Sequence, residues 1–238
     1  MIDLHCHVLP NVDDGAGSVE SALDLCRIAA SDGITHMVLT PHVHPGRYDN
    51  TLSSLTPHFD AFMSVVEDHG VPIEFSLAGE VRLCAEVLQI VSSNNLPILG
   101  YWGDKQVVLL EFPHGHIPPG SDKLVKWFLS KNIIPMIAHP ERNKAIIASV
   151  DVLNPFIEMG CLLQLTAMSV TGEFGEQAHE RAHDLLSKGW VTVIATDAHN
   201  QQHRPPILSN ARCVIEDRYG SMMAEQLFES NQRRLLRM

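Results

Sequence analysis

Histidine and carboxylate residues recur where apolar segments of this chain end. His5 and His7 close the first such segment, and Asp197 and His199 close the last. Alternate residues of an extended strand point to the same side, so the two side chains of each pair can reach one metal ion. A single histidine or acid at such a place is usually a core or surface residue, and the prediction therefore rests on how many of them occupy equivalent positions. The other candidates that end apolar segments are His42, Glu80, Glu111 and His139.

An acidic loop follows the first segment. Asp13 and Asp14 precede Gly15-Ala16-Gly17, and these glycines permit a tight turn that can fold a carboxylate back toward the strand ends. Mixed imidazole and carboxylate ligands suit manganese, iron or zinc in a hydrolytic centre. Nine candidate ligands are too many for one ion. Two or three ions, about 3.5–4 Å apart, can hold both the attacking and the leaving oxygen of a phosphoryl transfer and acidify a bound water.

Arginines near the candidate ligands supply a second kind of chemistry. Arg142 lies three residues after His139, and Arg204 lies five residues after His199. A guanidinium group matches the oxygens of a phosphate in a bidentate manner. Arginine beside several metal ions favours phosphoesters over amides as substrates. Arg47, in the segment HPGRYDN, is a third candidate.

Two other kinds of phosphate chemistry have signatures that this sequence lacks. Cysteine phosphatases carry an arginine six residues after the nucleophile, and no GxxxxGK[ST] loop of a P-loop NTPase occurs. The residues found six positions after the five cysteines are Val12, Asp32, Ile90, Ala167 and Tyr219.

Parallel strands must bring these distant residues together. Apolar runs that favour strands alternate with helical patterns, which is typical of a parallel sheet buried on both faces. About seven such units predict an α/β fold, a distorted TIM-like (β/α)7 barrel whose metal site lies at the C-terminal ends of the strands. An open doubly wound sheet is the alternative. The expected strands cover residues 1–5, 35–42, 73–80, 106–112, 133–140, 161–166 and 190–199. The expected helices cover 18–31, with Ser18 as N-cap, and 52–69, 121–130, 150–159, 173–187, 207–218 and 221–230.

Composition and charge narrow the predictions of domain number, binding partners and cellular location. A chain of 238 residues with 45% hydrophobic residues predicts one phosphoesterase domain over residues 1–238. Its formal charge of −11 disfavours nucleic acid as a partner. The sequence shows neither a signal peptide nor an apolar run long enough for membrane insertion. Five scattered cysteines fit reduced thiols, and we therefore expect a cytoplasmic protein.

Several segments together resemble a known family. They are MIDLHCHVLPNVDDGA, TPHVHPGR, AGEVRL, LLEFP, AHPERN and TDAHN with the following RPP, and they run in order from residue 1 to about 230. They resemble the polymerase-and-histidinol-phosphatase superfamily, and within it the bacterial manganese-dependent protein-tyrosine phosphatases of the capsule-regulating CpsB/CapC type.

This resemblance implies a specific site and activity. It implies a trinuclear manganese site in a distorted (β/α)7 barrel, with Glu80 as bridging carboxylate and with Arg142 and Arg204 holding the substrate phosphate. A metal-activated hydroxide would hydrolyse phosphotyrosine directly. The expected substrate is a protein, the tyrosine-rich C-terminal tail of a bacterial tyrosine kinase that controls capsular or exopolysaccharide synthesis. The ligands carried over are His5, His7, Asp14, His42, Glu80, Glu111, His139, Asp197 and His199.

Three other functions stay open at this point. A small-molecule phosphatase, such as one acting on histidinol phosphate, would keep the same metals and differ in the depth of its pocket. A non-catalytic metal-binding module would show no metal-stimulated turnover. A metal-dependent amidohydrolase would not need the arginine pair.

Overall fold

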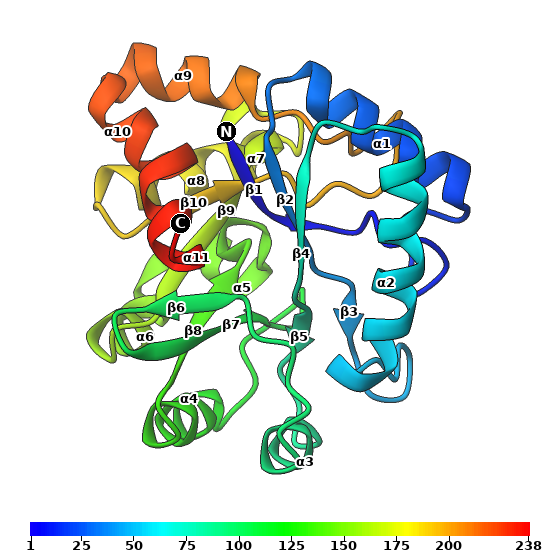
Figure 1. Cartoon of the computed structure of the whole chain (residues 1–238). Coiled ribbons are helices and arrows are strands. Elements are labelled where there is room, and N and C mark those ends of the chain that lie inside the picture. Colours follow the sequence, from blue (N-terminus) through cyan, green and yellow to red (C-terminus); the bar gives the residue numbers. More distant parts are fainter.

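The computed structural model describes residues 1–238, in which strands and helices alternate along most of the chain (Figure 1). The strands are β1 (Ile2–Cys6), β2 (His36–Leu39), β3 (His42–Val43), β4 (Glu74–Leu77), β5 (Glu80–Arg82), β6 (Gly100–Trp102), β7 (Lys105–Glu111), β8 (Ile133–Ala138), β9 (Leu162–Thr166) and β10 (Val193–Ala195). The helices are α1 (Val19–Ser31), α2 (Leu52–Asp68), α3 (Val87–Ser92), α4 (Ser121–Ser130), α5 (Lys144–Ala148), α6 (Asn154–Glu158), α7 (Ala167–Thr171), α8 (Glu176–Ser187), α9 (Ser209–Tyr219), α10 (Ser221–Glu225) and α11 (Asn231–Leu236), with short 3-10 turns at Pro140–Arg142 (η1) and Val150–Leu153 (η2) and a π-helical turn at Gln226–Ser230 (η3).

The strands form two mostly parallel sheets. One has the order β1-β2-β4, and the other has the order β10-β9-β8-β7-β5-β3, with β6 antiparallel on β7. The prediction of a mixed α/β fold with a parallel sheet is therefore confirmed. The predicted barrel is not present as one closed sheet. Main-chain hydrogen bonds nevertheless join β1 to the segment after β10, from Asp197 N to the His5 carbonyl at 2.7 Å and from His7 N to the Ala198 carbonyl at 2.8 Å.

Two predicted strands each divide between the two sheets. Residues 35–42 give β2 and β3, which are separated at Thr40-Pro41, and residues 73–80 give β4 and β5, which are separated at Ala78-Gly79. Proline has no N–H to donate to a neighbouring strand. At Gly79, a Cβ atom would lie 2.6 Å from Pro97 Cγ, so only glycine fits there. Apolar patterning continues through both breaks and could not reveal them.

Other differences concern short elements. Strand β6 and helix α3 were not predicted, because three and six residues are too few for a periodic pattern. The predicted strand 190–199 shortens to the three residues of β10, and helix 173–187 begins at Glu176. Ser18 caps α1 as predicted, its side chain accepting a hydrogen bond from Ser21 N at 3.1 Å. No helix combines the length and apolar character that a bilayer crossing requires.

A small core of 13 buried residues lies between the two sheets. Its side chains come from strands of both sheets, among them Leu4 of β1, Val38 of β2 and Leu109 of β7. Because alternate residues of a strand share a face, the strand that contributes Leu109 also directs Glu111 to the same side. Several strands thus lead from an apolar layer to a polar side chain at their carboxyl ends, and the candidate site lies over this core.

Candidate metal centre

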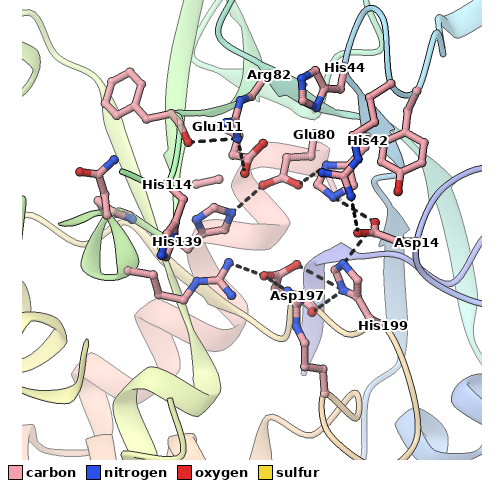
Figure 2. Close-up of a pocket in the computed structure, with 18 residues that line it drawn as sticks. Asp14, His42, His44, Glu80, Arg82, Glu111, His114, His139, Asp197 and His199 are labelled. Carbon is pink, nitrogen blue, oxygen red and sulfur yellow. Dashed lines mark hydrogen bonds and ion pairs between the residues drawn. The ribbon is translucent and has the colours of Figure 1, made fainter. Parts of the chain in front are cut away.

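The nine predicted ligands gather at one pocket beyond the small core, and Figure 2 shows those that line it. The pocket has a volume of about 330 Å³. Seven of the nine line it, while His5 and His7 are fully buried beneath. Residues that are far apart in the sequence therefore share one site.

Glu80 lies at the centre of the cluster. Its Oε1 accepts a hydrogen bond from His139 Nε2 at 2.7 Å. Its Oε2 is 2.9 Å from His42 Nδ1 and 3.5 Å from the Nε2 atoms of both His5 and His7. One buried carboxylate is thus shared among four imidazoles, an arrangement suited to a ligand that bridges two cations.

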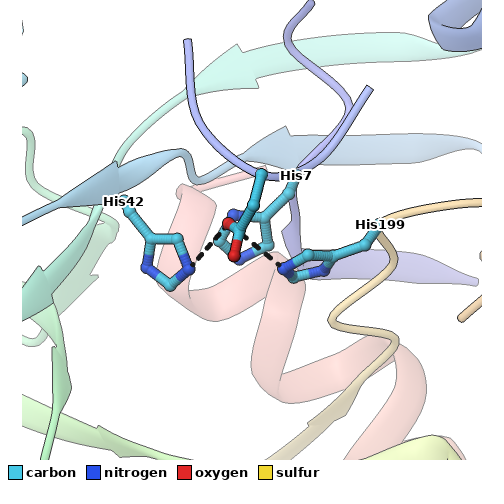
Figure 3. A group of neighbouring side chains, drawn as sticks. His7, His42 and His199 are labelled. Carbon is cyan, nitrogen blue, oxygen red and sulfur yellow. Dashed lines mark ion pairs between the residues drawn. The ribbon is translucent and has the colours of Figure 1, made fainter. Parts of the chain in front are cut away.

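The ligand atoms fall into three overlapping groups, each small enough to surround one ion. In each group, all the donor atoms lie within 4.8 Å of one another. Figure 3 shows the rings of His7, His42 and His199 close together. Asp14 Oδ1 lies 3.3 Å from His42 Nε2 and 3.8 Å from His199 Nε2. The groups are His7, Asp14, His42 and His199; His5, His7 and Glu80; and His42, Glu80 and Glu111.

Two buried atoms without hydrogen-bond partners indicate whether metal ions fit this cluster. Glu80 Oε2 and His42 Nδ1 face each other, yet neither is aligned for a hydrogen bond, and both lack a partner. Buried polar atoms are nearly always satisfied in folded proteins. A cation between them would satisfy both, and the imidazole and carboxylate donors are those that hydrolytic metal ions accept. The residues present therefore fit metal ions.

Side chains behind the cluster orient the first two histidines. His5 Nδ1 lies 2.9 Å from Gln164 Oε1, and His7 Nδ1 lies 2.7 Å from Asp13 Oδ2. Partners of this kind fix the ring orientation of metal-binding histidines. Sequence reasoning placed Asp13 in the right loop without giving it a role, and it missed Gln164. The available signal was a lone polar residue inside the apolar run CLLQLT.

Asp3 of β1, two residues before His5, also supports the site. It is fully buried, and its carboxylate accepts hydrogen bonds from Thr196 N at 2.9 Å and Thr196 Oγ1 at 2.5 Å. These bonds fix the residue that precedes Asp197. Burial raises the pKa of Asp3 to about 6, against the lowering effect of its bonds to Thr196.

Two arginines converge on Asp197. Arg142 Nη2 is 2.5 Å from Asp197 Oδ2, and Arg204 Nη2 donates to the same oxygen. The ring of Phe174, which the sequence did not suggest, lies 5.1 Å from the Arg142 Cζ and 6.0 Å from the Arg204 Cζ. The Nε atoms of both arginines are buried and have no hydrogen-bond partner. Only Nη2 of each guanidinium is hydrogen-bonded, to Asp197, so Nη1 remains as a donor for an incoming anion.

The pocket wall carries two further arginines. Arg82 Nη1 pairs with Glu111 Oε1 at 2.8 Å, a contact that sequence reasoning missed. Arg47 is mostly exposed and lies 3.7 Å from an oxygen of Asp14. Together with Arg142 and Arg204, they place four arginines in the pocket wall beside its four carboxylates.

Two of the predicted ligands have unusual backbone geometry. His139 has a φ of 33° and Asp197 a φ of 53°, in the left-handed region that residues other than glycine rarely adopt. Such conformations typically cost about 1–3 kcal/mol and cluster at functional sites. Here they turn each side chain at the point where strands β8 and β10 have ended.

Burial and neighbouring charges control protonation in the cluster. Burial lowers the pKa of His199 to about 3 and that of His139 to about 4, so both are neutral at pH 7. Burial also acts to lower the pKa of His42, but Asp14 and Glu80 raise it to about 9. Because imidazole binds metal only when neutral, a cation entering here must displace the proton of His42.

Comparisons with known proteins agree with this arrangement. The family model described as "Capsular polysaccharide synthesis, CpsB/CapC" matches residues 1–237. The tyrosine-protein phosphatase YwqE of Bacillus subtilis is 33% identical over 97% of this chain and 89% of its own length. The tyrosine-protein phosphatase CpsB of Streptococcus pneumoniae is 27% identical over 99% of this chain and 98% of its own length.

A solved structure is similar over the whole chain. It belongs to a pair of crystal structures, of YwqE from Bacillus subtilis and CpsB from Streptococcus pneumoniae, which are described as unique metal-dependent tyrosine phosphatases. It superposes with a TM-score of 0.92 at 32% sequence identity and covers 100% of this chain and 94% of its own.

Proposed function

This chain belongs to the CpsB/CapC family of capsular polysaccharide synthesis proteins, and we propose on that basis that it is a metal-dependent phosphatase of phosphotyrosine in proteins. The observation that carries the proposal is the joint placement of an imidazole–carboxylate cluster and two arginines, each with an unpartnered Nη1 atom, at one pocket. The cluster fits metal ions, and the arginines fit a phosphoryl group.

The nine residues would hold two or three ions, and we propose manganese as the native metal, with iron or zinc as alternatives. Glu80 is best placed to bridge two of them, because four imidazole nitrogens lie within 3.5 Å of its oxygens. When bound, such ions lower the pKa of coordinated water and offset the negative charge of the phosphoryl group. The ligands are His5, His7, Asp14, His42, Glu80, Glu111, His139, Asp197 and His199.

The chain's own residues bind and orient the substrate. Arg142 and Arg204 approach Asp197 from one side of the pocket and would receive the phosphate oxygens with their remaining donors. No cysteine, serine or threonine lines the pocket. The pocket therefore offers no thiol or aliphatic hydroxyl as a nucleophile, and we propose direct hydrolysis by water.

Removal of metal tests this function. We expect extensive chelation to abolish hydrolysis of a phosphotyrosine peptide, and we expect manganese to restore it more than zinc or iron. The measurement is metal content by mass spectrometry beside the rate of phosphate release. Histidinol phosphate and an amide substrate serve as comparisons. A chelated, metal-free protein that kept its full rate would contradict the proposal, and a preference for histidinol phosphate would favour the small-molecule alternative.

Phe174 supplies a second prediction. Because its ring lies against both guanidinium groups, Phe174→Leu should loosen their placement and leave the metal ligands intact. A cation–π contact contributes about 0.5–1 kcal/mol, so two of them predict a fall in kcat/KM of roughly 5–30-fold. Inhibition by orthophosphate should weaken in parallel, while metal content stays constant. Unchanged phosphate affinity would show that the ring does not position the arginines.

The proposal also covers the domain organisation, the barrel, the cellular location and the protein substrate. We propose that residues 1–238 act as one phosphoesterase domain and that the two sheets together form a distorted (β/α)7 barrel. The hydrogen bonds between β1 and the segment after β10 support this, as does the core shared by both sheets. A cytoplasmic location is supported by five unpaired cysteines. The proposed protein substrate is the C-terminal tail of a bacterial tyrosine kinase.

A further inference from the structure

An apolar groove lies beside the metal pocket, between helices α3 and α4, which lie next to each other at the bottom of Figure 1. It has a volume of about 470 Å³. Leu88 of α3, Leu124 and Trp127 of α4, and Pro118 and Pro119 before α4 line it. Lys123 is the only charged side chain in its lining. A groove with this lining suits an apolar side chain.

The groove and the metal pocket share their walls. Strand β5 carries Glu80 and Arg82, which line the metal pocket, and the next residue, Leu83, lines the groove. The segment after β7 also lines both cavities, because His114 lines the metal pocket and Pro118 lines the groove. Because the two linings adjoin along the chain at two places, the residues that flank a phosphotyrosine held in the metal pocket are the candidates to occupy the groove.

Leu88 indicates that the groove lacks a partner within the chain. It is one of four large hydrophobic side chains that stay exposed, with 39% of its surface accessible. Covering the exposed part of this side chain removes apolar surface from water, which is favourable. A partner that covered Leu88 while its phosphate was held in the adjoining pocket would gain this energy without any new charge contact.

We propose that this groove binds an apolar side chain that flanks the phosphotyrosine of the protein substrate. The inference rests on the proposed phosphatase function and adds a sequence preference to it. The metal pocket recognises the phosphoryl group, which every phosphotyrosine site shares. The groove discriminates among sites by the residue next to the phosphotyrosine. A small aryl phosphate without flanking residues reaches only the metal pocket.

The test uses phosphotyrosine peptides in which one flanking position at a time carries leucine or serine, with p-nitrophenyl phosphate as the substrate that lacks flanks. We expect the unaltered protein to favour leucine at one position by about tenfold in kcat/KM, the ratio that 1.4 kcal/mol gives. Leu88→Glu should abolish this preference, and Leu88→Ser should reduce it. Both variants should hydrolyse p-nitrophenyl phosphate at the unaltered rate.

Val152→Glu is the matched control, because Val152 is exposed to a similar extent, 37%, and does not line the groove. It should keep the preference for leucine. Absence of any flanking preference, or a preference that Leu88→Glu leaves intact, would overturn the groove assignment while the phosphatase function stands. If the metal-loaded protein hydrolyses neither peptide nor p-nitrophenyl phosphate, the proposed function itself fails, and the groove assignment fails with it.

Discussion

Glu80→Gln is expected to remove most of the bound metal and to lower kcat/KM for a phosphotyrosine peptide by about 1000-fold or more, equivalent to roughly 4 kcal/mol of transition-state stabilisation. The substitution keeps the size of the side chain and removes its charge. The carboxylate oxygens of Glu80 lie within 3.5 Å of nitrogens of four imidazoles. An amide cannot bridge two cations, and it places N–H donors against histidine nitrogens that must themselves bind metal. Metal content and peptide hydrolysis are measured on the same sample.

Glu141→Gln is the control for this substitution. Glu141 is also a fully buried carboxylate, and it accepts hydrogen bonds from Thr166 N at 2.9 Å and from Ser169 Oγ at 2.7 Å. It does not line the metal pocket. We expect this variant to keep its metal even if thermal unfolding shows it to be less stable. Normal metal content together with normal turnover in Glu80→Gln would refute the assignment of Glu80 as a ligand.

Arg142→Ala is expected to retain metal and to lose about 100–1000-fold in kcat/KM, the usual effect of deleting one group that stabilises transition-state charge. The affinity for orthophosphate should fall as well, because the guanidinium is proposed to hold the phosphate oxygens. Arg142→Lys should restore only part of the rate, since an ammonium group keeps the charge and lacks the planar pair of donors. Steady-state kinetics and phosphate inhibition provide the measurements.

Arg181→Ala is the matched control for Arg142→Ala. Both arginine side chains are 17% exposed, and each has a carboxylate oxygen 2.5 Å away, from Asp184 in the case of Arg181. Arg181 lies outside the metal pocket. We expect Arg181→Ala to leave phosphate affinity unchanged. If the two variants lose the same amount of activity, the loss in Arg142→Ala reflects general destabilisation. The proposed role of Arg142 in phosphate binding would then be wrong.

Side-chain chemistry and local periodicity were readable from the sequence. Apolar runs predicted most of the strands, and ligand-type residues at their ends predicted which side chains gather. Parallel strands place their carboxyl ends at the same end of the sheet or barrel. The sequence therefore predicted that His5 and His199 lie close together. The family resemblance then chose Asp14 from the pair Asp13 and Asp14.

Tertiary structure decided how these strands are arranged. The breaks at Pro41 and Gly79 send parts of two predicted strands into different sheets, and Gly79 is required by crowding from Pro97, eighteen residues further along. Near His5, the register of β1 shifts between Asp3 and Cys6. Such an irregularity can redirect a side chain, and the alternation of apolar residues gives no sign of it.

Sequence alone thus determined which donors this protein has and toward which end of the strands they lie. Only the tertiary structure paired His5 with Gln164, placed Phe174 against both arginines and opened a groove beside Leu88. The reason is physical. A pattern along the chain reports the direction of each side chain relative to its own backbone, whereas contacts between distant segments depend on how the whole core packs.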